Sequence, residues 1–296
     1  MISILIPVYN YSVVKLVSDL HAQAIALPCP FEIIVADDCS DAEYIEQNAA
    51  IEKFLNVRYI QVSENMGRAR IRNFLAHEAQ FQYLIFMDCD AEVCSDTFLQ
   101  TYYTYCTNTV LVCGGTAYDS QKTEKNKMLR WRYGLQREQI SARQRNTRPN
   151  ASFSTFNFLI SKSIIIQIPF NESIREYGHE DTLFGFELHK HGYKILHIDN
   201  QLIHKGLDEN AVFVEKTKRA IEGLFTLLHN PAIDQAFFSD ITLARFYSKV
   251  IQYRLRTCIK LIFILTQPLI KAFLIGGTAP MRVFDFFKLG YMCTLS

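Results

Sequence analysis

Short apolar runs alternate with segments of helical periodicity in the N-terminal part of the chain. In residues 13–26, apolar side chains recur every three or four positions, which indicates one buried face of a helix. The expected strands are residues 2–8, 31–38, 57–62 and 83–87, and the expected helices are residues 13–26, 44–55 and 68–80. Strands that alternate with helices predict an α/β fold with a mixed, mainly parallel sheet flanked by helices.

Acidic residues follow two of these predicted strands. Asp37 and Asp38 end the second strand, and Asp88 and Asp90 follow the fourth. Both positions lie at the carboxyl edge of the sheet, where open α/β sheets bind ligands. The carboxylates of Asp88 and Asp90 point to the same side of an extended chain, and a divalent cation between them would keep both ionised. The pair predicts a Mn²⁺ or Mg²⁺ site, with a solvated turn as the alternative for an isolated D-x-D motif.

Two later segments have an unusual balance of charge. Residues 122–148 hold nine Lys or Arg and two acids, and the fading periodicity predicts a mobile connection over the site rather than a core element. Residues 241–284 contain no Asp or Glu. If residues 243–262 form one helix, the basic side chains on one stripe are Arg245, Lys249, Arg256 and Lys260. We therefore expect a helical, basic and amphipathic C-terminal extension.

The uncharged runs of this extension are about half the length of the ~20 residues that a membrane helix needs. Pro268 also interrupts the first of them, so we do not expect the extension to span a membrane. The net charge of the chain is +1, from 31 basic and 30 acidic residues, and predicts no nucleic-acid partner. Eight scattered cysteines and an N-terminus without the features of a signal peptide predict a cytoplasmic location.

An ordered set of motifs accompanies this pattern. They are IPVYN at 6–10, ADDCSD at 36–41, ENMGRARIRN at 64–73, FMDCD at 86–90, NFLISKS at 157–163, YGHEDTLFGFEL at 177–188 and LIHKGLDEN at 202–210. In order and approximate spacing the set resembles family 2 inverting glycosyltransferases of bacterial polysaccharide or glycan synthesis. The resemblance implies their GT-A fold, a Rossmann-like nucleotide-diphospho-sugar transferase fold.

The resemblance also implies a division of the chain. It covers roughly residues 1–225, which would form the GT-A glycosyltransferase domain. The nucleotide-sugar half would be residues 1–115 and the acceptor half residues 116–225. Residues 226–296 would form the helical C-terminal extension.

A donor site and a metal site follow from the same resemblance. The nucleotide sugar would contact Pro7, Tyr9, Asp38, Arg72 and Asp88, with Tyr9 stacked on the base and Asp38 accepting from the N3 hydrogen of uracil. Without a ligand, Tyr9 would be a half-buried aromatic residue at a rim. The Mn²⁺ or Mg²⁺ ligands would be Asp88, Asp90 and His204, although a lone histidine is more often a surface or satisfied core residue.

Catalysis is expected at Glu180 and Asp181, in the first turn of a helix. Acids are common there for helix capping alone, which is the alternative. The resemblance implies that Asp181 takes the proton of the acceptor hydroxyl and that Glu180 binds or orients the acceptor, though the two roles could be exchanged. The reaction would be a single in-line displacement with inversion, and the metal would steady the departing diphosphate.

The function implied is transfer of a sugar from a nucleoside-diphosphate sugar, with UDP favoured, to a hydroxyl of a glycan or lipid-linked saccharide. The alternative is a non-catalytic GT-A-fold subunit of a polysaccharide assembly complex. A basic amphipathic extension indicates peripheral association with the anionic inner face of the plasma membrane. Packing of the extension on the catalytic domain, or dimerisation through it, is the competing interpretation.

Overall fold

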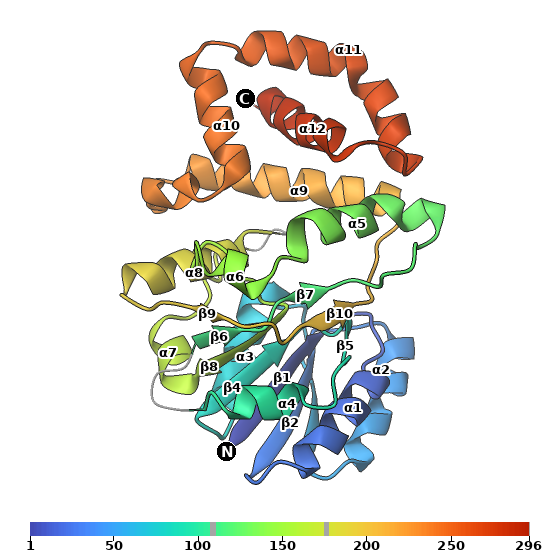
Figure 1. Ribbon diagram of the computed structural model, residues 1–296, viewed down its shortest axis with the longest axis vertical. Coiled ribbons are helices and arrows are strands. Elements are labelled where there is room, and N and C mark those ends of the chain that lie inside the picture. Colours follow the sequence, from blue (N-terminus) through green and yellow to red (C-terminus); the bar gives the residue numbers. More distant parts are fainter. Residues whose placement is uncertain (107–110, 175–177, 296) are drawn as a thin grey trace. The chain divides into compact units, whose positions relative to one another are not determined.

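The computed structural model describes residues 1–106, 111–174 and 178–295 (Figure 1). The chain forms two compact units. The first is built from residues 1–119, 138–175 and 180–206, and the second from residues 120–137, 176–179 and 207–296.

A seven-stranded sheet forms the centre of the first unit. Its strands, in spatial order, are β3 (Val57–Gln61), β2 (Phe31–Asp37), β1 (Ile2–Val8), β4 (Tyr83–Met87), β8 (Asn157–Ser161), β6 (Leu111–Cys113) and β9 (Leu196–His197). The β8 strand is antiparallel to both its neighbours, and the other pairs are parallel. The predicted mixed, mainly parallel sheet is confirmed.

Helices cover both faces of this sheet. They are α1 (Val14–Ile25), α2 (Ala42–Ala49), α3 (Gly67–Glu78), α4 (Phe98–Tyr103), α6 (Ala142–Arg145), α7 (Lys162–Gln167) and α8 (Glu180–Lys190), with a 3-10 turn at Ala50–Lys53. Because side chains alternate along a strand, Ile4 and Ile6 of β1 join the same core as Leu20 of α1. Leu5 points the other way and joins the core that contains Leu75 of α3.

A small three-stranded sheet brings two distant segments together. Its order is β5 (Ala91–Glu92), β10 (Leu202–His204) and β7 (Thr116–Ala117). In the antiparallel pair of β5 and β10, His204 lies opposite Ala91. His204 therefore lies beside the turn that follows β4.

The basic segment 122–148 is not the mobile connection that its sequence predicts. It contains a 3-10 turn (Lys125–Lys127), α5 (Met128–Tyr133), a π-helix (Gly134–Glu138) and α6. These helices have four to six residues, too few for a periodic pattern to be recognised in the sequence.

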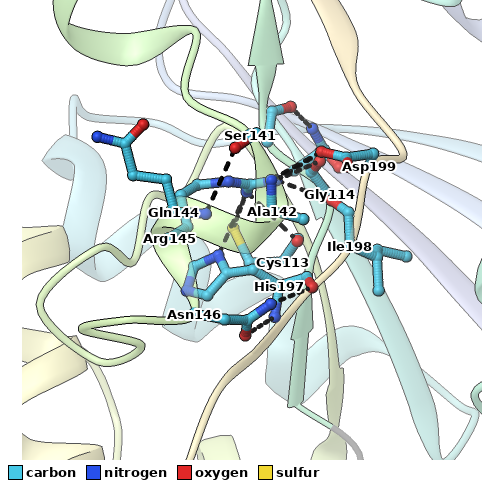
Figure 2. A network of polar contacts seen from close by, with 12 residues as sticks. Cys113, Gly114, Ser141, Ala142, Gln144, Arg145, Asn146, His197, Ile198 and Asp199 are labelled. Atoms are coloured by element: carbon cyan, nitrogen blue, oxygen red, sulfur yellow. Dashed lines mark hydrogen bonds and ion pairs between the residues drawn. The ribbon is translucent and has the colours of Figure 1, made fainter.

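Buried polar contacts hold α6 on the first unit (Figure 2). The guanidinium of Arg145 is buried and donates to the carbonyl oxygens of Gly114 at 3.1 Å and Ile198 at 2.7 Å. It also lies 3.2 Å from Nδ1 of His197, whose Nε2 is 2.8 Å from the Pro149 carbonyl oxygen. Burial lowers the pKa of His197, and its neutral ring can donate from Nε2 and accept from Arg145 at Nδ1.

The second unit is helical. Besides α5 it contains α9 (Asn210–Leu228), a 3-10 helix (Gln235–Ser239), α10 (Thr242–Gln252), α11 (Arg256–Ile275) and α12 (Met281–Thr294). Figure 1 shows α12 enclosed by α9, α10 and α11. Its aromatic residues Phe284 and Phe287 are fully buried in the core of this unit. The helix α9 belongs to this unit, whereas the predicted division at residue 225 stays a prediction.

The expectation of one helix over residues 243–262 is wrong. The α10 helix ends at Gln252, and Arg254 has a left-handed backbone conformation with φ of +57° before α11 begins at Arg256. The helix α11 is 20 residues long and contains Pro268. Its mean hydropathy is 1.9 over the most apolar window, so by length and composition alone it could cross a membrane.

Candidate active site

The turn after β4 directs its two acidic side chains to different partners. The backbone N–H of Asp88 donates to the Phe156 carbonyl oxygen at 3.1 Å, which fixes the end of the strand. The Asp88 carboxylate accepts from Nη2 of Arg72 at 2.7 Å. The Asp90 carboxylate lies 3.3 Å from Nε2 of His204. The predicted residues therefore assemble as two pairs at one edge of the sheet.

Arg72 joins the turn after β4 to the first turn of α8. Its guanidinium is 3 % exposed, and its Nη1 atom is 3.5 Å from Oε1 of Glu180, which is also buried. The helix α3 turns Arg72 inward beside Ala69 and Ala76, whereas Arg70 points to solvent. The sequence predicts Arg72 at the donor site, but no pattern in it indicates this bridge to Glu180.

The neighbouring Asp181 is poised to accept a proton near neutral pH. Burial, reinforced by the charge of Glu180, raises the pKa of Asp181 to about 6. The backbone N–H and the hydroxyl of Thr182 donate to its carboxylate and limit that increase. A carboxylate with a pKa close to the working pH is suited to general-base catalysis.

Asp38 orders the loop that leads into α3. Its carboxylate accepts from the backbone N–H groups of Met66 at 2.5 Å and Gly67 at 3.0 Å. Burial raises the pKa of Asp38, although these backbone donors oppose the shift. Asp37 accepts from the N–H of Ser40 at 2.7 Å and so caps the turn.

Two further predicted donor residues lie at the end of β1. Tyr9 is 54 % exposed, so its ring is open to a ligand, and Pro7 is paired with Ala36 in the sheet. The contact of Asp38 with a base remains a prediction. A carboxylate has about four acceptor positions, so two backbone donors leave room for another.

Asp90 and His204 lie together where the sequence predicts a metal site. A Cβ atom at Gly206 would lie 2.2 Å from Oδ2 of Asp90, so the glycine allows the carboxylate its place. The rings of Tyr118 and Phe156 flank His204, each with centroids 5.4 Å away. Carboxylate oxygens with one imidazole are ligands that Mn²⁺ accepts.

The third expected ligand, Asp88, faces Arg72, and within the described residues no three His, Cys, Asp or Glu side chains are gathered closely enough to hold an ion. The positions of Gly206, Tyr118 and Phe156 around Asp90 and His204 were not expected from the sequence. The glycine two residues after His204 was the available signal, and the flanking aromatic residues had none.

The raised pKa of Asp181 leads to a prediction about how the free energy of unfolding depends on pH. A pKa raised from 3.8 to about 6 means that the folded state favours the protonated form, so this contribution is complete below pH 3.8 and is lost as the pH rises through 6. Asp181→Asn should therefore be more stable than the wild type by about 3 kcal/mol at pH 8 and by about half as much at pH 5. Urea denaturation at both pH values measures this difference.

The exposed acid Asp96 supplies the control, because Asp96→Asn should change the free energy of unfolding little at either pH. A gain for Asp181→Asn that is the same at pH 5 and pH 8 would contradict the assigned cause.

The bridge of Arg72 makes a second prediction. Arg72→Met should lose about 3–5 kcal/mol of stability, because two carboxylates, one of them buried, lose their shared cation. Arg72→Lys should lose less, since one positive charge remains. The control is Arg70→Met, which removes an exposed pair with Glu64 and should change stability by less than about 1 kcal/mol. Equal effects of Arg72→Met and Arg70→Met in urea denaturation would refute the bridge.

Comparison with known proteins agrees with this architecture. The sequence profile of glycosyl transferase family 2 matches residues 3–169. Chondroitin synthase of Escherichia coli is 26 % identical over an alignment of 231 positions, and the match covers 64 % of this chain and 32 % of that protein. The chain thus spans about a third of the length of this relative.

Two solved structures share the fold. The S. aureus TarS 1-349 structure has a TM-score of 0.52 at 17 % identity, covering 95 % of this chain and 82 % of that one. The mannosyltransferase PcManGT of Pyrobaculum calidifontis has a TM-score of 0.53 at 13 % identity, covering 93 % and 85 %. With the family profile matching more than half of its residues, the chain belongs to glycosyl transferase family 2 and is a glycosyltransferase with a GT-A-like fold.

Proposed function

We propose that this glycosyltransferase moves a sugar from a nucleoside-diphosphate sugar to a hydroxyl of a glycan or lipid-linked saccharide in cell-surface polysaccharide synthesis. The observation that carries the proposal is the bridge of Arg72. One buried arginine side chain pairs through Nη2 with Asp88, at the expected donor site, and through Nη1 with Glu180, next to the expected base. This arrangement supports a donor bound near Asp88 and an acceptor bound near Glu180, so that the two substrates would meet.

Structures of similar fold support a nucleotide-sugar donor. TarS 1-349 has been crystallised in complex with UDP-GlcNAc, and PcManGT in complex with GDP-Man and Mn²⁺. For the present chain we favour UDP, because an exposed Tyr9 and the carboxylate of Asp38 suit stacking and hydrogen bonding with uracil. The name of chondroitin synthase supports a glycan acceptor.

Asp181 is the proposed base and Glu180 the orienting residue. Glu180 faces the guanidinium groups of both Arg68 and Arg72, at 3.6 and 3.5 Å, and is thereby held in place. In the reaction the acceptor hydroxyl oxygen bonds to the anomeric carbon while the bond from that carbon to the diphosphate oxygen breaks. The hydroxyl proton passes to Asp181, and the electron pair leaves with the diphosphate.

Asp88, Asp90 and His204 would hold a Mn²⁺ or Mg²⁺ ion. When bound, such an ion supplies positive charge to the departing diphosphate. Arg72 adds charge of its own at Asp88, within hydrogen-bonding distance of that carboxylate. We also propose that the protein acts in the cytoplasm at the inner face of the plasma membrane, where lipid-linked acceptors are accessible.

The donor site is tested by calorimetric titration of UDP, GDP and dTDP with and without Mn²⁺. We expect metal-dependent binding of one nucleotide to the wild type, and loss of that binding in Asp90→Ala. Asp181→Asn should keep the binding and lose about 100- to 10,000-fold of the sugar transfer rate, since it cannot accept the proton. Asp96→Ala, an exposed acid, should keep both.

If none of the nucleotides binds, with or without Mn²⁺, the enzymatic proposal is refuted and the non-catalytic subunit is favoured.

Gly206 provides a further prediction for the metal. Gly206→Ala places a methyl group against Oδ2 of Asp90 and should displace that carboxylate from His204. We expect Mn²⁺ affinity, measured by calorimetry, to fall about tenfold or more. In the Asp90→Gly background the same substitution should have little further effect, because the Oδ2, Cγ and Cβ atoms that it would meet are gone. An equal loss in both backgrounds would show that Gly206 does not act through Asp90.

A further inference from the structure

The polarity of α11 is the reverse of that of a surface helix in water. Its inner face packs in the second unit through Phe263, Ile270 and Leu274. The outward residues are apolar, and Leu265 is 81 % exposed. The other large apolar side chains exposed on α11 are Leu261, Ile262, Ile264, Leu269, Phe273 and Ile275. We call these seven residues the apolar face of α11. A helix facing water normally places polar side chains outward.

The charged residues of α11 lie toward the protein. At about 100° per residue, Arg256, Lys260 and Lys271 are at least 120° away from Leu265. Arg256 donates from Nε to the Cys293 carbonyl oxygen of α12 at 3.4 Å, and Lys271 pairs with Glu215 of α9 at 3.2 Å. Arg256 and Lys271 therefore bind partners within the unit, and the large exposed side chains on the outward face of the helix are apolar.

Exposed basic residues precede α11 along the chain. The helix α10 and the corner that joins it to α11 expose the basic side chains of Arg245, Lys249 and Arg254. Phe246 and Tyr253 are exposed between them, at 56 % and 67 %. The whole stretch 241–284 holds seven basic residues and no acid. Such a combination of apolar and basic surface complements the interior and the headgroups of an anionic bilayer.

The packing of α11 favours a helix that lies in the membrane surface over one that spans it. The ring of Phe263 lies 5.7 Å from that of Phe287 of α12, and a Cβ atom at Gly290 would meet it at 2.4 Å. One side of α11 is thus closely fitted to α12. Spanning would expose that side to lipid and would carry Arg256, Lys260 and Lys271 away from their places in the unit.

A second copy of the chain fits this surface less well. In a symmetric dimer the same patch meets itself, so the side chains available to pair with the basic residues come from the same segments of the second copy. With no acid in residues 241–284, these segments offer no opposite charge to pair with them.

We propose that the apolar face of α11, with the basic corner from α10, docks in the plane of an anionic lipid bilayer. The inference rests on the proposed membrane location and names the surface that serves it. It does not depend on the sugar-transfer chemistry, because every residue involved lies in the second unit.

The test is sedimentation of the full chain with vesicles of phosphatidylcholine, with and without phosphatidylglycerol. The wild type should bind the anionic vesicles at least tenfold more tightly than the neutral ones. Leu265→Glu with Leu269→Glu should reduce binding to anionic vesicles by tenfold or more. Arg245→Glu with Lys249→Glu should remove the preference for anionic lipid. The matched control, Leu55→Glu, changes an equally exposed leucine of the first unit and should bind like the wild type.

Nucleotide binding, measured on the same variants, separates the two proposals. Normal nucleotide binding without vesicle binding overturns only the docking, whereas vesicle binding without nucleotide binding overturns only the donor site. Light scattering identifies the other occupant: a wild-type dimer that Leu265→Glu converts to a monomer, without vesicle binding, would assign the face to a second copy. Resistance to carbonate extraction from cells would show a spanning helix and would also overturn in-plane docking.

Discussion

The site depends on the two ion pairs that the buried guanidinium of Arg72 makes. The guanidinium holds Asp88 at the end of β4 and Glu180 at the start of α8, two segments distant in the sequence. A buried charge without partners is costly, so the three groups stabilise one another's positions. The predicted donor contacts and the predicted base are consequently held in one rigid frame rather than on independent loops.

The same frame sets the protonation of Asp181. Glu180 is held beside two arginines, and its negative charge, together with burial, raises the pKa of its neighbour. The folded protein thereby gives up stability at neutral pH in exchange for a carboxylate that can both release and accept a proton there. At the predicted metal ligands the backbone matters instead: Gly206 lacks a side chain, so Asp90 can lie beside His204.

The second unit differs in where its apolar and charged side chains lie. Its inner core is aromatic and closely packed around α12, while α11 turns its charges inward and its leucines outward. A surface of this kind is stable only against something less polar than water. The exposed arginines and lysine of α10 and of the corner after it make an anionic membrane the proposed partner. The unit therefore fits the role of locating a catalytic domain at its acceptor.

Local information in the sequence determined the elements of the first unit and the family. Hydrophobic runs and helical periods are properties of neighbouring residues, so β1 to β4 and the acids that follow β2 and β4 could be placed without coordinates. Only the tertiary structure decided that Arg72 bridges to Glu180, that Gly206 lies against Asp90 and that Arg254 divides two helices. These depend on burial and on contacts between distant segments, which no local pattern encodes. The outward face of α11 belongs to the same class, since composition shows that a helix is apolar but only packing decides which side meets the protein.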